Sequence, residues 1–160
     1  MALYIFAGIF FLVFGLDLIL KQYVEENVGD REVKKVKFTG GKLLIRKVYN
    51  KGAFLRFMEK RAGFVKYFSA AVGAGIAAYD VFLFRKKGHP VLKTGMTLIS
   101  AGAASNLFDR FGRGKVIDYI GVDAGPAKVR QITWNLADLS ILAGTVLTMI
   151  AIPFQKVKKK

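Results

Sequence analysis

Four long apolar segments constrain the fold of this 160-residue chain more than any other feature. They run from Ala2 to Leu20, Ala62 to Phe84, Val91 to Phe108 and Trp134 to Phe154. A helix that crosses a bilayer needs about 20 predominantly apolar residues. The first segment lacks a basic start and a small-residue cleavage site, so we interpret it as a retained span and not as a removed signal peptide. The pattern predicts a bundle of four transmembrane helices.

The segments between the spans predict a small amount of β-structure on one side of the membrane. Apolar and basic residues alternate through 32–50 on either side of Thr39-Gly40-Gly41, which is typical of a β-hairpin. Residues 53–61 fit a short amphipathic helix at the interface. Residues 127–134 fit a second extended segment, which leads into the fourth span and can pair with the hairpin. We therefore predict an all-α membrane protein of one domain, residues 1–160, a four-transmembrane-helix bundle with a small β-hairpin or sheet on one side of the membrane; the family resemblance given below implies that this side is extracytoplasmic.

The formal net charge of +15 suits either a nucleic-acid binder or a membrane protein that rests on anionic lipid headgroups. The mean hydropathy is positive, which favours lipid over nucleic acid. Charge counting leaves the orientation open. More Lys and Arg lie in the loops 21–61 and 109–133, but the cations of 85–93 and of the C-terminal tail are packed more densely against span ends.

Polar side chains gather at the span ends on one side of the predicted bundle. Alternating spans bring these ends to the same membrane face, and polar groups near spans usually face a bundle interior or a wet cavity. Convergence on one face therefore predicts a site. Its candidate residues are Asp17, Lys21, Asn50, Asn106, Asp109, Arg110, Asp118, Asn135 and Asp138.

The chemistry open to this face is that of paired carboxylates. The one histidine, His89, lies in the loop on the opposite side, and no zinc motif or cysteine is present, so we expect neither a serine hydrolase nor a metal or cofactor. Asp118, placed in a loop, and Asp138, about one turn inside the fourth span, remain. Two close carboxylates share a proton and can act as acid and base on water. Asp17 and Lys21, four residues apart, fit an interfacial ion pair that ends the first span.

Two other classes of function fit the same residues. A small proton-coupled carrier would use intramembrane carboxylates as a relay, and it predicts polar residues spread along the depth of the bundle. A membrane-inserted module that binds anionic lipid would account for the charge and would need neither aspartate.

Four blocks of the sequence resemble the lipoprotein signal peptidases, signal peptidase II, over nearly the whole chain. "LDLILK" (16–21) is similar to an Asp-x-x-x-Lys motif at the end of that family's first helix, and "YNKGAFLRF" (49–57) to its Asn-x-Gly-Ala-x-Phe block. "AGAASNLFDRFGRGKVIDYI" (101–120) resembles Gly-Asn-Leu-x-Asp-Arg followed by Gly-x-Val-x-Asp-Phe. "WNLADLSILAG" (134–144) resembles Phe-Asn-x-Ala-Asp-x-x-Ile-x-x-Gly.

The resemblance implies an aspartic endopeptidase of the bacterial cytoplasmic membrane, with cytoplasmic termini and the site near the outer face. Its implied substrates are diacylglyceryl-modified prolipoproteins, cut before the lipid-bearing cysteine by a monomer without a metal. Asp118 and Asp138 match the family's catalytic pair. The other matches are substrate-binding or site-supporting residues, namely Asn50, Gly52, Asn106, Asp109, Arg110 and Asn135. Asp17 and Lys21 match a structural pair.

The chain departs from the family's pattern at several positions. Ser105 stands where glycine is usual, Tyr119 stands where phenylalanine is common, and Trp134 replaces a frequent phenylalanine. The block after Asn50 lacks its second alanine and following glycine and carries Arg56. These departures bear on substrate preference and on the backbone near Asn106, and they leave both aspartates in place.

Overall fold

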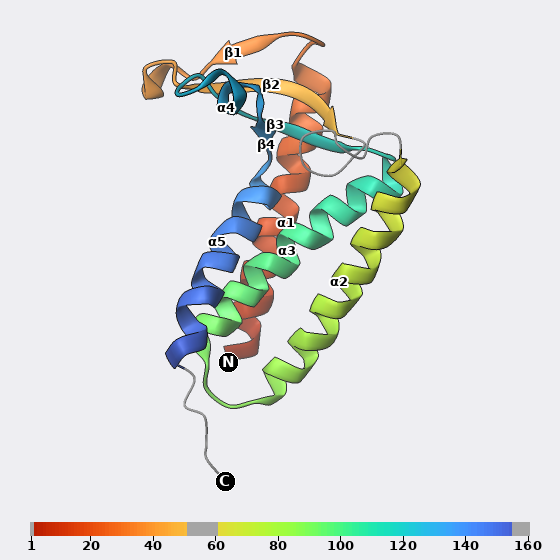
Figure 1. Ribbon diagram of the computed structural model, residues 1–160, viewed down its shortest axis with the longest axis vertical. Coiled ribbons are helices and arrows are strands. Elements are labelled where there is room, and N and C mark those ends of the chain that lie inside the picture. The colour runs from red at the N-terminus through yellow and green to blue at the C-terminus, as the bar shows by residue number, and fades with distance from the viewer. Residues whose placement is uncertain (1, 51–60, 155–160) are drawn as a thin grey trace.

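A computed structural model describes residues 2–50 and 61–154, and it consists of a helical bundle with a small sheet across one end (Figure 1). The long helices are α1 (Ala2–Asn27), α2 (Ala62–Arg85), α3 (Pro90–Gly112) and α5 (Leu136–Ala151). The sheet contains β1 (Val33–Lys35), β2 (Leu43–Asn50), β3 (Val116–Val122) and β4 (Thr133–Trp134). α1 begins and α5 ends at the end of the bundle away from the sheet. Shorter elements are α4 (Ala127–Gln131) and the 3₁₀ turns η1 (Lys37–Thr39) and η3 (Ile152–Phe154).

Helix α3 is the centre of the bundle, because α1, α2 and α5 all pack against it. Its closest partner is α5, and glycines allow the approach. A methyl group added at Gly102 would lie 2.6 Å from the Ser140 Oγ, and one added at Gly95 would lie 2.8 Å from the Gly144 carbonyl oxygen. Small residues at helix contacts let backbones come close when no hydrophobic force drives association in lipid. The α3–α5 contact therefore fixes the two helices that carry Asn106 and Asp138.

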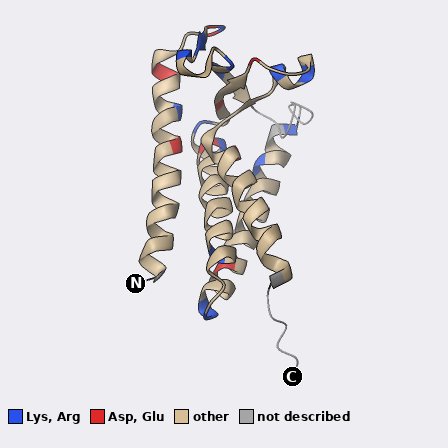
Figure 2. Ribbon diagram, turned by 90° about the vertical axis from the view of Figure 1, so that its left-hand side faces the viewer, with Lys and Arg blue, Asp and Glu red and all other residues tan. Residues whose placement is uncertain are grey.

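The outward faces of the helices suit a lipid surrounding. Two described helical segments, Leu3–Asn27 and Gly63–Arg85, are long and apolar enough to cross a membrane, and few of their residues are buried. Helix α5 is apolar but has only 16 residues. Figure 2 shows that Lys, Arg, Asp and Glu are sparse along the helices and gather at the sheet end and the far loop. The expected number of four spans is not confirmed by these lengths and stays a prediction.

The sheet is antiparallel throughout, in the order β1-β2-β3-β4. The predicted hairpin is confirmed, since β1 and β2 pair on either side of a turn in which Gly40 and Gly41 have left-handed φ values of 63° and 77°. The predicted extended segment 127–134 is wrong over most of its length: 127–131 form α4, and only Thr133–Trp134 pair, with β3. Pro126 is the N-cap of α4, and the helical turn that begins there takes these residues out of the extended conformation. The expected interfacial helix at 53–61 lies outside the described residues, apart from its last residue.

A buried apolar cluster anchors the sheet to the bundle. It contains Val24 from the last turn of α1, Val28 directly after that helix, and Ile117 and Tyr119 from β3, each at most 3% exposed. Burial of such side chains contributes roughly 1.5–3 kcal/mol each. Strand β3 is therefore held against α1 by packing as well as by its pairing with β2.

Substituting Gly102 by alanine should destabilise the protein by about 1–3 kcal/mol, because the added methyl group has no room against α5. The matched control is Gly75→Ala, since a methyl group there meets no atom within 4 Å. Thermal unfolding of the purified variants in detergent measures the effect. Equal midpoints for the two variants would contradict the proposed role of close α3–α5 packing.

Candidate active site

Helix α5 begins with a reciprocal cap that presents Asp138 at the sheet end of the bundle. Asn135 is extended (φ −124°), and its Oδ1 accepts the Asp138 N–H at 2.8 Å while the Asp138 Oδ2 accepts the Asn135 N–H at 3.2 Å. Such a capping box satisfies two helix-end donors at once. The other Asp138 oxygen, Oδ1, accepts the Asn106 Nδ2–H at 2.9 Å. The carboxylate is thus fixed by groups from both α3 and α5.

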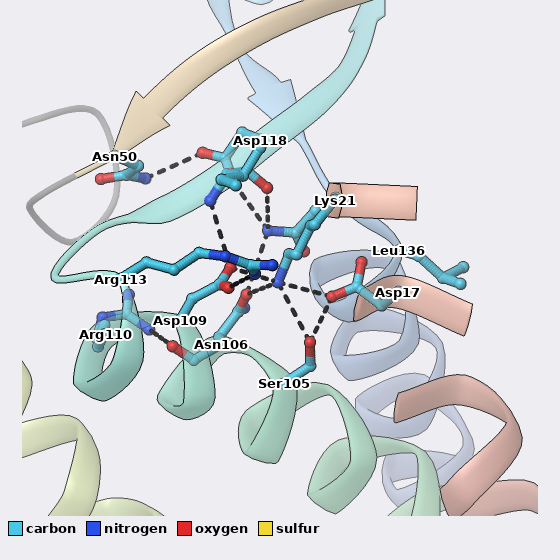
Figure 3. A network of polar contacts seen from close by, with 12 residues as sticks. Asp17, Lys21, Asn50, Ser105, Asn106, Asp109, Arg110, Arg113, Asp118 and Leu136 are labelled. Atoms are coloured by element: carbon cyan, nitrogen blue, oxygen red, sulfur yellow. Dashed lines mark hydrogen bonds and ion pairs between the residues drawn. The ribbon is translucent and has the colours of Figure 1, made fainter. Parts of the chain in front are cut away.

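Asp118 lies in the middle of β3 and is 4% exposed. Its Oδ2 accepts from Asn50 Nδ2 at 3.2 Å and its Oδ1 from Asn135 Nδ2 at 2.8 Å, and Figure 3 shows Asn50 facing it from the end of β2. The register of β2 against β3 shifts by a bulge between Ile45 and Val48, next to the Val48–Asp118 pair. Bulges often re-aim side chains beside sites. Asn135 therefore bonds to both carboxylates, through its side chain to Asp118 and through its backbone to Asp138.

The surroundings of Asp118 favour its protonated form. Burial raises the pKa of this carboxyl most, the negative charge of Asp138 raises it further, and the pKa reaches about 7. Hydrogen bonds from Asn50 and Asn135 and the charge of Lys21 act in the opposite direction. A carboxyl with such a pKa exchanges its proton near neutral pH, which suits acid–base chemistry.

Lys21 is fully buried and is the hub of a polar network that orders Asn106. Its ammonium lies 2.7 Å from Asp17 Oδ2 and 2.9 Å from Asp109 Oδ2, and it donates to Asn106 Oδ1 at 3.0 Å (Figure 3). Asn135 Nδ2 also donates to that Asn106 oxygen, at 3.2 Å. Because both donors occupy the oxygen, the amide nitrogen of Asn106 must face Asp138. Lys21 thereby sets the orientation of a group that touches the carboxylate pair.

Asp109, Arg110 and Arg113 lie at the end of α3 and take part in its polar contacts. Asp109 accepts from Lys21, from the backbone N–H of Ile117 at 3.3 Å, and from the Arg113 guanidinium, which also donates to Gln22 on α1. Arg110 donates to the Asn106 carbonyl at 3.3 Å, and its charge interacts with Asp138 and Asp118. The end of α3 thus supplies one cation at the carboxylates and one anion for Lys21.

Two cavities reach the two aspartates from different sides. One, of about 340 Å³, lies between α2, α3 and α5, and Asn106, Arg110 and Asp138 share it with apolar residues that include Phe68, Val72 and Ile141. The other, of about 420 Å³, lies over the sheet and is more polar; its lining includes Arg46, Asn50, Asp118, Gln131 and Thr133. Within residues 2–50 and 61–154, no group of three or more His, Asp or Glu side chains could hold a metal ion.

A family model described as signal peptidase (SPase) II matches residues 9–154. This chain belongs to the signal peptidase II family. The lipoprotein signal peptidase of Janthinobacterium sp. (strain Marseille) is 36% identical over 105 residues, and that of Cupriavidus taiwanensis is 33% identical over 104. These alignments cover 62% and 64% of this chain and 60% and 58% of the relatives, so the matched part spans about three fifths of the curated proteins' length.

Two solved structures share the fold of this chain. One described as a bacterial membrane enzyme, determined by the in meso method, superposes with a TM-score of 0.80 at 23% identity, covering 97% of this chain and 91% of that one. A second with the same description gives 0.75 at 22% identity, with 97% and 94% coverage.

The structure brings nearly all of the predicted site residues together, and it corrects two expectations. Gly52 lies outside the described residues. Asp118 was expected in a loop but lies on a strand, because β2 and β4 pair on both sides of β3. The Asp17–Lys21 pair was expected to end the first helix at the interface. That is wrong, because α1 continues to Asn27 and both side chains are fully buried.

Two contributors were missed in the sequence. The i,i+4 spacing of Asp109 and Arg113 was a usable signal for an ion pair on the last turn of α3. The Tyr119 hydroxyl had no such signal, because its partners Asp17 and Leu136 are far away along the chain.

Replacing Lys21 by methionine should destabilise the folded protein by about 3–5 kcal/mol, since it leaves the buried carboxylates of Asp17 and Asp109 without their cation. Lys34→Met, which removes an exposed ion pair with Glu32, is the matched control and should have little effect. Thermal or denaturant unfolding in detergent measures both. A Lys21→Met protein as stable as the control would show that the network does not depend on the ammonium.

The raised pKa of Asp118 predicts how stability changes with pH. The unfolded carboxyl loses its proton near pH 3.8 and the folded one near 7, so the folded protein binds more protons between these values. The free energy of unfolding should therefore decrease as the pH rises from about 4 to about 7, and this contribution should level off above 7. The Asp118→Asn variant should lack this pH-dependent contribution, because the asparagine side chain does not titrate. Parallel stability curves for the wild type and Asp118→Asn across this range would refute the assignment.

Proposed function

We propose that this protein is an endopeptidase that removes the signal peptide from diacylglyceryl-modified bacterial prolipoproteins, before the lipid-bearing cysteine. The observation that carries the proposal is the joint bonding of Asp118 and Asp138 to Asn135. One of these carboxyls has a pKa of about 7, which suits the sharing of a proton by the pair. The names of the relatives and the family of the chain support the same substrate class.

In the proposed mechanism, a water molecule lies between the two aspartates and attacks the carbonyl carbon of the scissile peptide bond. The ionised carboxylate takes a proton from the water, and the protonated one gives its proton to the leaving amine as the C–N bond breaks. The Asn106 amide and the Arg110 guanidinium lie beside Asp138 and would orient the substrate backbone. No cofactor takes part in these steps.

The two cavities suggest how such a substrate would lie. The apolar cavity between α2, α3 and α5 suits the acyl chains and the signal peptide, which stay among the spans. The polar cavity over the sheet suits the residues after the cleavage point, with Asn50 and Gln131 in its lining. In this arrangement the scissile bond lies at the boundary of the two cavities, where the carboxylates are. Gly52 is proposed to support the site from the segment after Asn50.

We further propose that the chain is a single domain, 1–160, that crosses the cytoplasmic membrane four times as a monomer. Both termini would be cytoplasmic, and the sheet and the site would lie at the outer face. Exposed apolar side chains along the helices support the spans, for example Phe11, Leu12 and Met149. Exposed cations of the sheet, such as Lys34 and Lys35, would lie on anionic lipid headgroups.

A proton-coupled carrier is the alternative function that the carboxylates allow. Among the described residues, a deeper polar pair exists where the Ser100 hydroxyl donates to Asp80 at 2.5 Å. Within the described part of the chain, no hydrogen bond of the network above connects this pair to Asp138, whose bonded neighbours all lie at the sheet end. A peptidase therefore fits the distribution of polar groups better than a relay along the bundle.

Asp118→Asn and Asp138→Asn should each reduce cleavage of a lipid-modified precursor peptide by at least about a thousandfold, because each removes one partner of the acid–base pair. Purified protein, a diacylglyceryl-modified precursor and mass-spectrometric detection of the cut measure this directly. An unmodified precursor should not be cut.

The matched control is Asp123→Asn, which changes an exposed aspartate directly after β3 that pairs with Lys35 and Arg130. It should cleave at the wild-type rate. Near-normal cleavage by either Asp118→Asn or Asp138→Asn would reject the aspartic mechanism, and an inactive wild-type protein would reject the function.

A further inference from the structure

Two hydroxyl groups converge on the carboxylate of Asp17. Ser105 Oγ donates to Asp17 Oδ2 at 2.6 Å, and Tyr119 Oη donates to Asp17 Oδ1 at 3.0 Å. Ser105 and Asp17 are fully buried, and Tyr119 is 3% exposed (Figure 3 shows Ser105 and Asp17 facing each other). Burial and the charge of Asp17 raise the pKa of Tyr119, so its hydroxyl keeps the proton that it donates. Ser105 and Tyr119 are also the positions where the signal peptidase II pattern given above has a glycine and a phenylalanine.

Each hydroxyl belongs to a residue directly beside a site residue. Ser105 precedes Asn106 on α3, and Tyr119 follows Asp118 on β3. The Tyr119 oxygen also accepts the Leu136 N–H at 3.1 Å, in the first turn of α5 below Asp138. Asp17 on α1 therefore links, through two hydroxyls, all three elements that carry the carboxylates and Asn106.

We propose that Ser105 and Tyr119 are positioning residues, which act through Asp17 to hold Asn106, Asp118 and Asp138 in register for cleavage. This inference rests on the proposed function. Neither side chain lines the two cavities at the aspartates, so neither is expected to touch the substrate.

The reason lies in how the buried charges share their hydrogen-bond donors. A buried carboxylate needs donors on both oxygens. With the two hydroxyls in place, Asp17 has three donors. Lys21 can then also reach Asp109, Asn106 and the Ser105 oxygen, at 2.9, 3.0 and 3.2 Å. If glycine replaced Ser105 and phenylalanine replaced Tyr119, Lys21 would be the one donor left to Asp17 of these three. The ammonium would move toward Asp17, and the Asn106 amide would lose the contact that orients it toward Asp138.

The test compares Ser105→Gly, Tyr119→Phe and the double variant with the wild type in cleavage of the lipid-modified precursor. We expect kcat to fall about tenfold or more in each single variant with KM within about twofold, because misplacement of reacting groups affects the chemical step. The double variant should lose less than the product of the single effects, since both hydroxyls act on one carboxylate. Tyr67→Phe, which removes an exposed tyrosine hydroxyl on α2, is the matched control and should keep the wild-type kcat.

Assays run at a temperature below the unfolding transition of every variant, so that a loss of folded protein does not reduce kcat. Wild-type cleavage with unchanged kcat in both Ser105→Gly and Tyr119→Phe would overturn the positioning role and leave the proposed function intact. A rise in KM at constant kcat would overturn it as well, because it would indicate substrate contact. If the wild-type protein fails to cleave, the proposed function is wrong and the positioning role falls with it.

Discussion

The site depends on one buried ammonium group. Lys21 lies where four polar partners from α1 and α3 meet, and removing such a cation from water is costly unless its hydrogen bonds are all made. Asp17 and Asp109 supply the opposite charge, and Arg113 compensates Asp109 from the side nearer to solvent. These interior charges therefore balance only when α1 and α3 are together, and β3 adds hydrogen bonds from the Ile117 N–H and the Tyr119 hydroxyl. Stability and site geometry follow from the same interaction.

The sequence predicted the site residues better than it predicted the elements that carry them. Polar residues at span ends are few and conspicuous against apolar surroundings, so Asp17, Asn106 and Asp138 could be picked out and assigned to one face. Strand β3 was not predicted, because "VIDYIGV" is short and pairs with β2, more than 60 residues away along the chain. Local propensity carries no information about such a partner. Asp118 was therefore placed in a loop although it belongs to an inner strand of the sheet.

The burial of the Asp17–Lys21 pair in α1 was not predicted for a similar reason. Spacing indicated correctly that Asp17 and Lys21 are bonded. It could not indicate that α3 and β3 cover the pair, since burial depends on the tertiary contacts of Ser105 and Tyr119. The glycine contacts between α3 and α5 were also not predicted, since the sequence does not show which helices meet.

Asn135 has two structural roles. It caps α5, and it is hydrogen-bonded to both Asp118 and Asp138. The first turn of a helix normally frays with little cost, because its amides are bonded to nothing else in the helix. Here, fraying would also release Asp118 and separate the aspartates. The two carboxylates should thus be either held together or separated, and partial loosening of this turn should leave no intermediate arrangement of the pair.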